Sequence, residues 1–214
     1  MTDKIQTTLR DSAAMRWTAL LLLSLAMFCA YIFVDILSPI KELMQEQRGW
    51  DSTAFGTMQG SETFLNVFVF FLIFAGIILD KMGVRFTAIL SGAVMLTGAL
   101  IKYYAISDSF AGSALDVWFT DHLNHIPVFE QLGVSPFYEG MPASAKVAAC
   151  GFMIFGCGTE MAGITVSRGI VKWFKGREMA LAMGSEMALA RLGVATCMIF
   201  SPFFAKLGGH VDVS

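Results

Sequence analysis

The sequence predicts an all-α membrane protein with five transmembrane helices, and three observations carry this prediction. Hydrophobic residues make up 56% of the 214 residues and charged residues only 15%. The mean hydropathy is +0.64. Soluble domains carry roughly 25% charged residues, so this composition favours a lipid environment. A spanning helix needs roughly 20 apolar residues, and five runs are long enough: 17–40, 53–79, 86–106, 145–167 and 180–204.

The runs differ in what surrounds and interrupts them. The first is longer than the apolar part of a cleaved signal peptide, and similar runs follow it, so we expect it to remain in the protein. The second run ends before a charged turn at Asp80, and the third begins after Arg85. The fourth and fifth contain small residues that let helices approach closely in lipid. These are Gly151, Gly156, Gly158, Ala162 and Gly163 in the fourth run, and Gly184, Ala188 and Gly193 in the fifth.

The distribution of Lys and Arg predicts the orientation of these helices. Basic residues flank alternate connections, which places those connections and the N-terminus in the cytoplasm. They are Lys4, Arg10, Arg16, Lys81, Arg85, Arg168, Lys172, Lys175 and Arg177. The connection 107–144 contains no Lys or Arg and is acidic, so it is predicted to be external. We expect an integral protein of a bacterial inner (plasma) membrane.

These boundaries divide the chain into three parts. Residues 1–16 form a cytoplasmic tail, and residues 17–204 form five helices with the external loop 107–144. Residues 205–214 form an external tail. Because the fifth helix would leave the chain outside with no return helix, we expect a truncated polypeptide, or one half of something larger.

Two charges near the membrane midplane are the strongest functional signal. Arg191 and Glu160 lie in the middle of the fifth and fourth apolar runs. Burying either alone costs several kcal/mol, so each needs a partner or a water-filled cavity. In one interpretation they pair and lock the two helices together. In the other they face a cavity, where Arg191 binds a substrate carboxylate through its planar guanidinium and Glu160 binds an ammonium group.

Other polar residues in the runs are weaker candidates. Asp35 and Glu62 lie in the outer halves of the first two runs, and a carboxyl group there could carry a proton. Both proton coupling and uniport remain open. Lys102 and Lys146 lie near external helix ends, where their side chains would snorkel to the surface, and no transport role is assigned to them.

The sequence gives little support for a metal site, a cofactor, an enzyme or a nucleic-acid interface. His122 and His125 stand three apart beside Asp121, but without a third strong ligand a solvated face is the favoured interpretation over a metal site. The cysteines form no Cys-x-x-Cys pair and are expected to be buried apolar residues. No zinc-protease pair or nucleophile elbow is present, and no basic aromatic patch for nucleic acid. No cofactor or metal is expected.

The cytoplasmic turn between the second and third runs carries a first resemblance. It reads Gly76-Ile-Ile-Leu-Asp80-Lys81-Met-Gly83-Val-Arg85, with a glycine that permits a tight reversal at position 83. In this position it resembles the signature loop of the major facilitator superfamily. Val84 departs from that pattern, which is often basic there. The resemblance implies that Gly76, Asp80, Lys81, Gly83 and Arg85 take part in conformational gating.

Three further segments, in order, resemble the branch of that superfamily containing the lysosomal dipeptide uniporter. They are 155–160 (Phe-Gly-Cys-Gly-Thr-Glu), 172–178 (Lys-Trp-Phe-Lys-Gly-Arg-Glu) and 190–193 (Ala-Arg-Leu-Gly), with Tyr31 and Asp35 fitting less specifically. The resemblance spans about residues 28–207. It implies the N-terminal part of a transporter with two six-helix halves, whose sixth helix and C-terminal half are missing here.

The predicted function is therefore secondary transport of a small solute by alternating access, with a dipeptide or another zwitterionic metabolite as the substrate. The expected binding residues are Glu160, Arg191, Asp35 and Glu62, and the expected partners are the solute, the lipid bilayer and the missing half. A membrane-embedded enzyme and a non-transporting receptor or assembly subunit are the alternatives.

Overall fold

The computed structural model describes residues 12–124, 131 and 136–207, and the regular structure in these ranges is helical throughout. Four helical segments within them are long and apolar enough to cross a membrane: Ala13–Arg48, Phe71–Ile106, Ala143–Phe174 and Met179–Ala205. The chain is therefore an all-helical protein with the features of an integral membrane protein. The structure does not confirm the five separate spanning helices predicted from the sequence.

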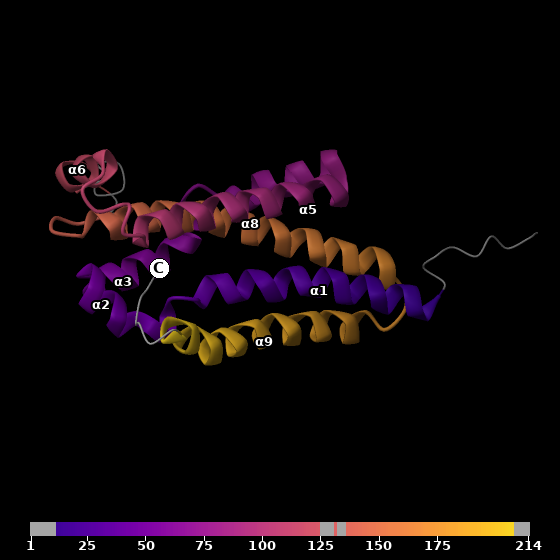
Figure 1. Ribbon diagram of the computed structural model, residues 1–214. Helices are drawn as coiled ribbons and strands as arrows, with labels where there is room; N and C mark the ends of the chain where they lie inside the picture. The colour runs from indigo at the N-terminus through magenta and orange to yellow at the C-terminus, as the bar shows by residue number, and fades with distance from the viewer. Residues whose placement is uncertain (1–11, 125–130, 132–135, 208–214) are drawn as a thin grey trace, which may run out of the picture.

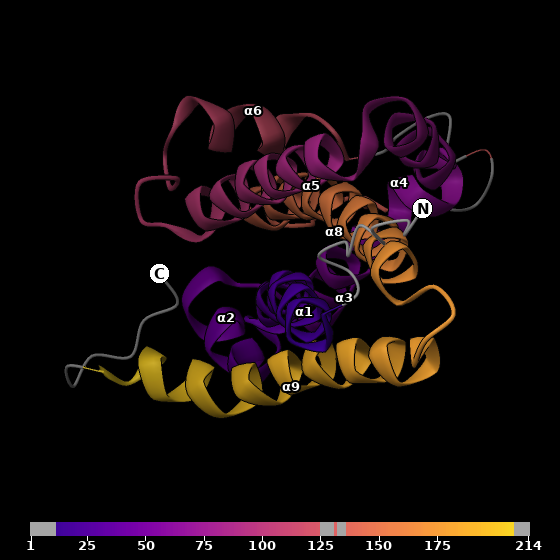
Figure 2. The same ribbon diagram turned by 90° about the vertical axis from the view of Figure 1, so that its right-hand side faces the viewer.

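The long helices pack as two pairs (Figures 1 and 2). Helix α1 (Ala13–Asp35) lies along α9 (Met179–Ala205), and α5 (Phe71–Ile106) lies along α8 (Ala143–Phe174). At one end a cluster that includes Leu20, Ile170 and Ala182 joins α1, α8 and α9. The two pairs thus meet at the end where the predicted cytoplasmic connections lie.

The predicted second helix, residues 53–79, is broken into several pieces. It comprises α3 (Ser52–Gly60), the 3-10 turn η3 (Ser61–Thr63), α4 (Phe64–Phe68) and the first part of α5. The hydroxyls of Ser61 and Thr63 donate to the carbonyls of Met58 and Gly60, at 2.6 and 3.3 Å. Such local hydrogen bonds compete with the helix ladder. A second break follows at Phe70, whose φ of 54° is left-handed.

Contacts with α8 show the direction in which this broken segment runs. Ser61 donates to the carbonyl of Ala149 at 3.0 Å, Asn66 donates to that of Gly156 at 3.4 Å, and Asp80 pairs with Arg168. Each later residue meets a later position on α8. The segment therefore descends parallel to α8 from the predicted external end to the predicted cytoplasmic end.

The chain reverses at Gly83. Its φ of 80° and ψ of 169° interrupt α5, in a region of conformational space that is essentially restricted to glycine. Beyond it, the space for a side chain at Gly158 is taken by Ser91 and Met95, and the space at Gly151 by Gly98 and Lys102. The second part of α5 therefore runs antiparallel to α8. The predicted tight reversal at Gly83 is confirmed.

Small residues make the contact between α5 and α8 close. A Cβ added at Gly151 would lie 2.9 Å from the carbonyl oxygen of Gly98, and one at Gly158 would lie 2.8 Å from the backbone nitrogen of Met95. The glycines of the fourth run thus bring helices together as predicted, although their partners are α5 and η3. In the fifth run Gly193 packs against the backbone of Phe28 on α1, whereas a Cβ added at Gly184 would meet no other described element within 4 Å.

A helical cap covers the predicted external end of the bundle. Helix α1 gives way at Ser38–Ile40 (η2) to α2 (Lys41–Arg48), and α3 follows. Helix α6 (Ala114–Asp121) lies beside α5 and α8 at the same end (Figure 1). Trp50 and Met44, both fully buried, anchor the cap in a core that also includes Phe152 of α8.

Candidate functional site

A cavity of about 610 Å³ lies between the two helix pairs, toward the capped end. Its walls come from α1, η2, α5, α8 and α9, and its lining is mostly apolar. Phe33, Phe155, Phe200 and Phe204 are among the aromatic residues that line it. A concave, largely apolar site with few polar groups is the usual form of a small-molecule pocket. We call it the outer cavity.

Lys102 is the one charged residue among the described residues that line the outer cavity. Its side chain projects from the last turns of α5 and is only 6% exposed. Its ammonium nitrogen lies 3.9 Å from the centroid of the Phe152 ring, a cation–π contact. The sequence placed this lysine at a helix end, free to reach the surface. That expectation is wrong, because the cap covers this end of α5 and buries the side chain.

Two of the other predicted binding residues, Asp35 and Glu160, lie within electrostatic range of Glu62. Glu62 interacts with the charges of Glu160, Lys102 and Asp35. Asp35 accepts hydrogen bonds from Ser38 at 3.3 Å and from Gln59 at 3.4 Å. The backbone of Glu62 packs against Gly156, where any side chain would collide with it. The break in the second helix therefore carries Glu62 against the middle of α8, one helical turn from Glu160.

Arg191 lies apart from this group. Its guanidinium lies 5.6 Å from the ring centroid of Tyr31 on α1, and its side chain is exposed. Within the described residues no ion pair joins Arg191 to Glu160. The reason is geometric, since α9 packs mainly on α1 and α8 mainly on α5. The ion pair that the locking interpretation requires between the fourth and fifth helices is therefore not formed between these two residues.

The predicted gating turn is tied to α8. Asp80 and Arg168 form an ion pair, and both side chains are partly exposed. Lys81 and Arg85 are exposed, and Gly76 is half-buried within the descending part of α5. Gly83 and Arg85 line a hollow of about 810 Å³ at this end of the molecule, together with Trp173. The turn thus lies far along the bundle from the outer cavity.

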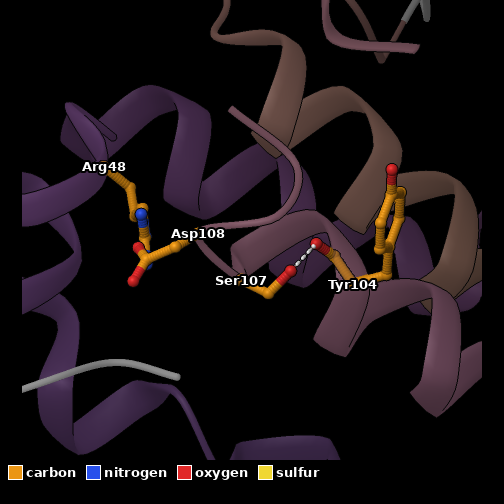
Figure 3. A network of polar contacts seen from close by, with 4 residues as sticks. All are labelled: Arg48, Tyr104, Ser107 and Asp108. Atoms are coloured by element: carbon orange, nitrogen blue, oxygen red, sulfur yellow. Dashed lines mark hydrogen bonds and ion pairs between the residues drawn. The ribbon is translucent and has the colours of Figure 1, made fainter. Parts of the chain in front are cut away.

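Polar contacts hold the cap to the helix ends. Arg48 at the end of α2 forms an ion pair of 2.7 Å with Asp108, just beyond α5, where Ser107 donates to the carbonyl of Tyr104 at 2.7 Å (Figure 3). Trp50 donates to Ser144 at 2.8 Å. These bonds fasten the cap to both α5 and α8.

Tyr138 adds a further bond at this end. Its hydroxyl donates to Asp51 at 3.1 Å, and burial together with this acceptor raises the pKa of Tyr138 above its ordinary value. Asp51 also accepts from the backbone N–H of Ala54 at 2.7 Å and so caps α3. The Asp51 carboxylate thus caps the N-terminus of α3 and also accepts a hydrogen bond from Tyr138, in the segment before α8.

The histidine pair and the cysteines can be compared with what the sequence predicts for them. Among the described residues no group of three His, Cys, Asp or Glu side chains is arranged to hold a metal ion. His122 stacks on Trp118, whereas His125 lies outside the described residues. All four cysteines are free, and Cys157 and Cys197 are buried as expected, whereas Cys29 is exposed.

Lys146, like Lys102, is buried against expectation and is only 1% exposed. Its ammonium donates to the carbonyl of Phe119 at 2.9 Å and to the side-chain oxygen of Asn124 at 2.7 Å. The two lysines differ in their partners, because Lys102 has no hydrogen-bond acceptor among the described residues.

No family profile, curated protein or solved structure matches this chain.

Proposed function

We propose that this chain forms part of a secondary transporter that moves a small solute across a membrane by alternating access. The observation that carries the proposal is the group of ionisable residues Asp35, Glu62, Lys102 and Glu160 between apolar helix pairs. Charged residues are costly within a membrane and commonly mark substrate or ion pathways. One member of this group, Lys102, borders the outer cavity.

The interruptions in the helices support the same proposal. The descending segment is broken at Ser61–Thr63 and at Phe70. Irregular backbone at membrane depth is tolerated where it is buried in protein or lines a water-filled cavity, and broken helices form the binding sites of many transporters. The break at η3 lies against the middle of α8, where Glu62 and Glu160 are found.

Our proposed substrate is a small zwitterion such as a dipeptide. Glu160 would bind its ammonium group and Arg191 its carboxylate, with a second half of the transporter as the partner that completes the pathway. Arg191 suits this role because its guanidinium is exposed and is not bound to an acidic residue of the described chain. Uniport and proton coupling to Asp35 or Glu62 are the two mechanisms to be separated.

Uptake by reconstituted protein tests this function. Liposomes containing the purified full-length protein should accumulate a labelled dipeptide faster than protein-free liposomes. Uptake that responds to an imposed pH gradient supports proton coupling, and uptake that does not supports uniport. Binding without uptake would contradict transport and favour a receptor, whereas chemical conversion of the solute would favour an enzyme.

The proposed orientation has its own test. Basic residues place the segment around Trp173 in the cytoplasm and that around Trp118 outside. Cysteines introduced at these two positions, in a variant lacking the four native cysteines, should differ in labelling by a membrane-impermeant thiol reagent. We expect Trp118→Cys to label in intact cells and Trp173→Cys to label only after lysis. Equal labelling in intact cells would contradict the orientation.

A further inference from the structure

We propose that the outer cavity binds a small carboxylate with an apolar body, and that the ammonium group of Lys102 holds the carboxylate. This site is separate from the proposed clamp of Glu160 and Arg191. Only the role of the site in transport rests on the proposed function, because binding to the cavity can be measured without transport.

The first observation is an ammonium group without a hydrogen-bond acceptor. Lys102 is 6% exposed, and no acceptor among the described residues lies within hydrogen-bond reach of its Nζ atom. This atom is buried over the ring of Phe152, which does not line the cavity, and the Lys102 side chain borders the cavity beside it. A buried ammonium carries three donors and is costly to leave unpaired. When the flexible end of the lysine side chain turns toward the cavity, a carboxylate there would supply both an opposite charge and the missing acceptors.

The nearby acidic residues do not occupy this position. Glu62 and Asp35 act on Lys102 through their charge, but neither forms an ion pair with it in the described part of the chain. Asp35 accepts its bonds from Ser38 and Gln59. Neither carboxylate therefore uses the hydrogen-bond donors of Lys102, which are left for a ligand.

The rest of the lining selects the body of the ligand. The hydroxyls of Ser201 and Thr196 donate to the carbonyls of Ile36 and Leu192, at 2.6 and 2.8 Å, so both donors are already used. The remaining wall is dominated by aliphatic and aromatic side chains. One cation in an apolar wall suits a monocarboxylate with an aromatic or aliphatic tail. A second charged group on the ligand would be desolvated without a partner.

Three compounds of the same shape test the proposal: 4-phenylbutyrate, its neutral amide and 4-phenylbutylamine. Their binding to the full chain is measured by calorimetry in detergent, where the amide corrects for partition into micelles. We expect the carboxylate to bind at least about tenfold more tightly than the amide, since a hydrogen bond to a charged group has this strength. The amine should bind more weakly than the amide because Lys102 repels it.

Variants then identify the group responsible. Lys102→Gln should remove the preference for the carboxylate and leave binding of the amide unchanged, and Lys102→Arg should keep the preference. Lys146→Gln is the matched control, because Lys146 is also buried but does not line the cavity. Should Lys102→Gln fail to fold, Ala99→Phe gives a second test. It fills the cavity while keeping Lys102, and it should abolish binding of both compounds.

The outcomes separate this site from the transport proposal. Carboxylate preference that survives in Lys102→Gln, or that is lost only in Arg191→Gln, would overturn the site. Uptake of a dipeptide by protein that binds phenylbutyrate no better than the amide would also overturn it, while the proposed function would stand. Binding of phenylbutyrate with the expected preference, without uptake of any solute, would support the site and contradict transport.

Discussion

Asp80 and Arg168, 88 positions apart in the chain, form an ion pair between the end of the descending part of α5 and helix α8. Gly83 follows at once and reverses the chain. The pair therefore fixes the turn against a long helix at the end of the bundle opposite the outer cavity. Exposed ion pairs contribute only about 0–1 kcal/mol to stability, so we expect this pair to contribute little to folding.

We predict that Asp80→Asn slows uptake by liposomes with little change in the concentration that gives half-maximal uptake. The carboxylate is placed to exchange partners between conformations and lies far from the proposed solute site. The melting temperature should change little, for the reason given above. Glu139→Gln, which removes an exposed acid outside the turn, is the control. Wild-type uptake in Asp80→Asn would reduce the turn to an ordinary membrane anchor.

The glycine contact between α5 and α8 gives a prediction about stability. Gly151→Ala should destabilise the protein by about 1–3 kcal/mol, the usual cost of overpacking, because the new Cβ would meet the backbone of Gly98 and Lys102. Gly184→Ala is the matched control in α9, where the added Cβ would meet no other part of the described chain within 4 Å. It should be neutral or stabilising by up to about 1 kcal/mol. Thermal unfolding in detergent measures both, and equal effects would contradict the close packing of α5 on α8.

Phe70 tests the break in the descending segment. A left-handed backbone costs a non-glycine residue roughly 1–2 kcal/mol, so Phe70→Gly should stabilise the protein by about 1 kcal/mol. Phe74→Gly, at another exposed phenylalanine four residues later within α5, should destabilise it by a similar amount. If instead the segment were one continuous helix, as the sequence alone predicts, both substitutions would be destabilising.

The long helices were predictable from sequence because length and hydropathy suffice to find them. The break in the second run was harder to find, since Val69 and Phe70 lie in an uninterrupted apolar stretch. The local signal was present at Gly60, Ser61 and Thr63, where flexible and hydroxyl-bearing residues meet. Hydropathy averaged over a window conceals such a signal.

The site was less predictable than the helices. Counting residues along a helix gives the depth of a side chain in the membrane, but it does not show which helices pack together. Glu160 and Arg191 were placed at similar depth, but the chain does not encode in any simple pattern that α8 pairs with α5 and α9 with α1. The burial of Lys102 is hard to predict for a related reason. Its distance from the helix end predicted solvent access, and only the tertiary position of the α2–α3 cap shows that it is buried.

The last prediction concerns Arg191 and Glu160. If they formed a structural lock, removing one charge would leave the other buried and unpaired, and removing both would restore stability. Because the structure forms no such pair among its described residues, we predict that Arg191→Ala and Glu160→Gln each change the melting temperature little.

The solute dependence of the same variants tests the proposed clamp. Stabilisation of the full-length protein by a dipeptide should be lost in Arg191→Ala for solutes with a free carboxylate, and weakened in Glu160→Gln for solutes with a free amine. A dipeptide with an amidated C-terminus and one with an acetylated N-terminus separate the two ends. If the clamp is correct, amidating the C-terminus of the dipeptide should not change its binding to Arg191→Ala. Acetylating its N-terminus should likewise not change its binding to Glu160→Gln. A double variant that regains stability lost in the single variants and still transports would show that the two charges are a lock and that the solute binds elsewhere.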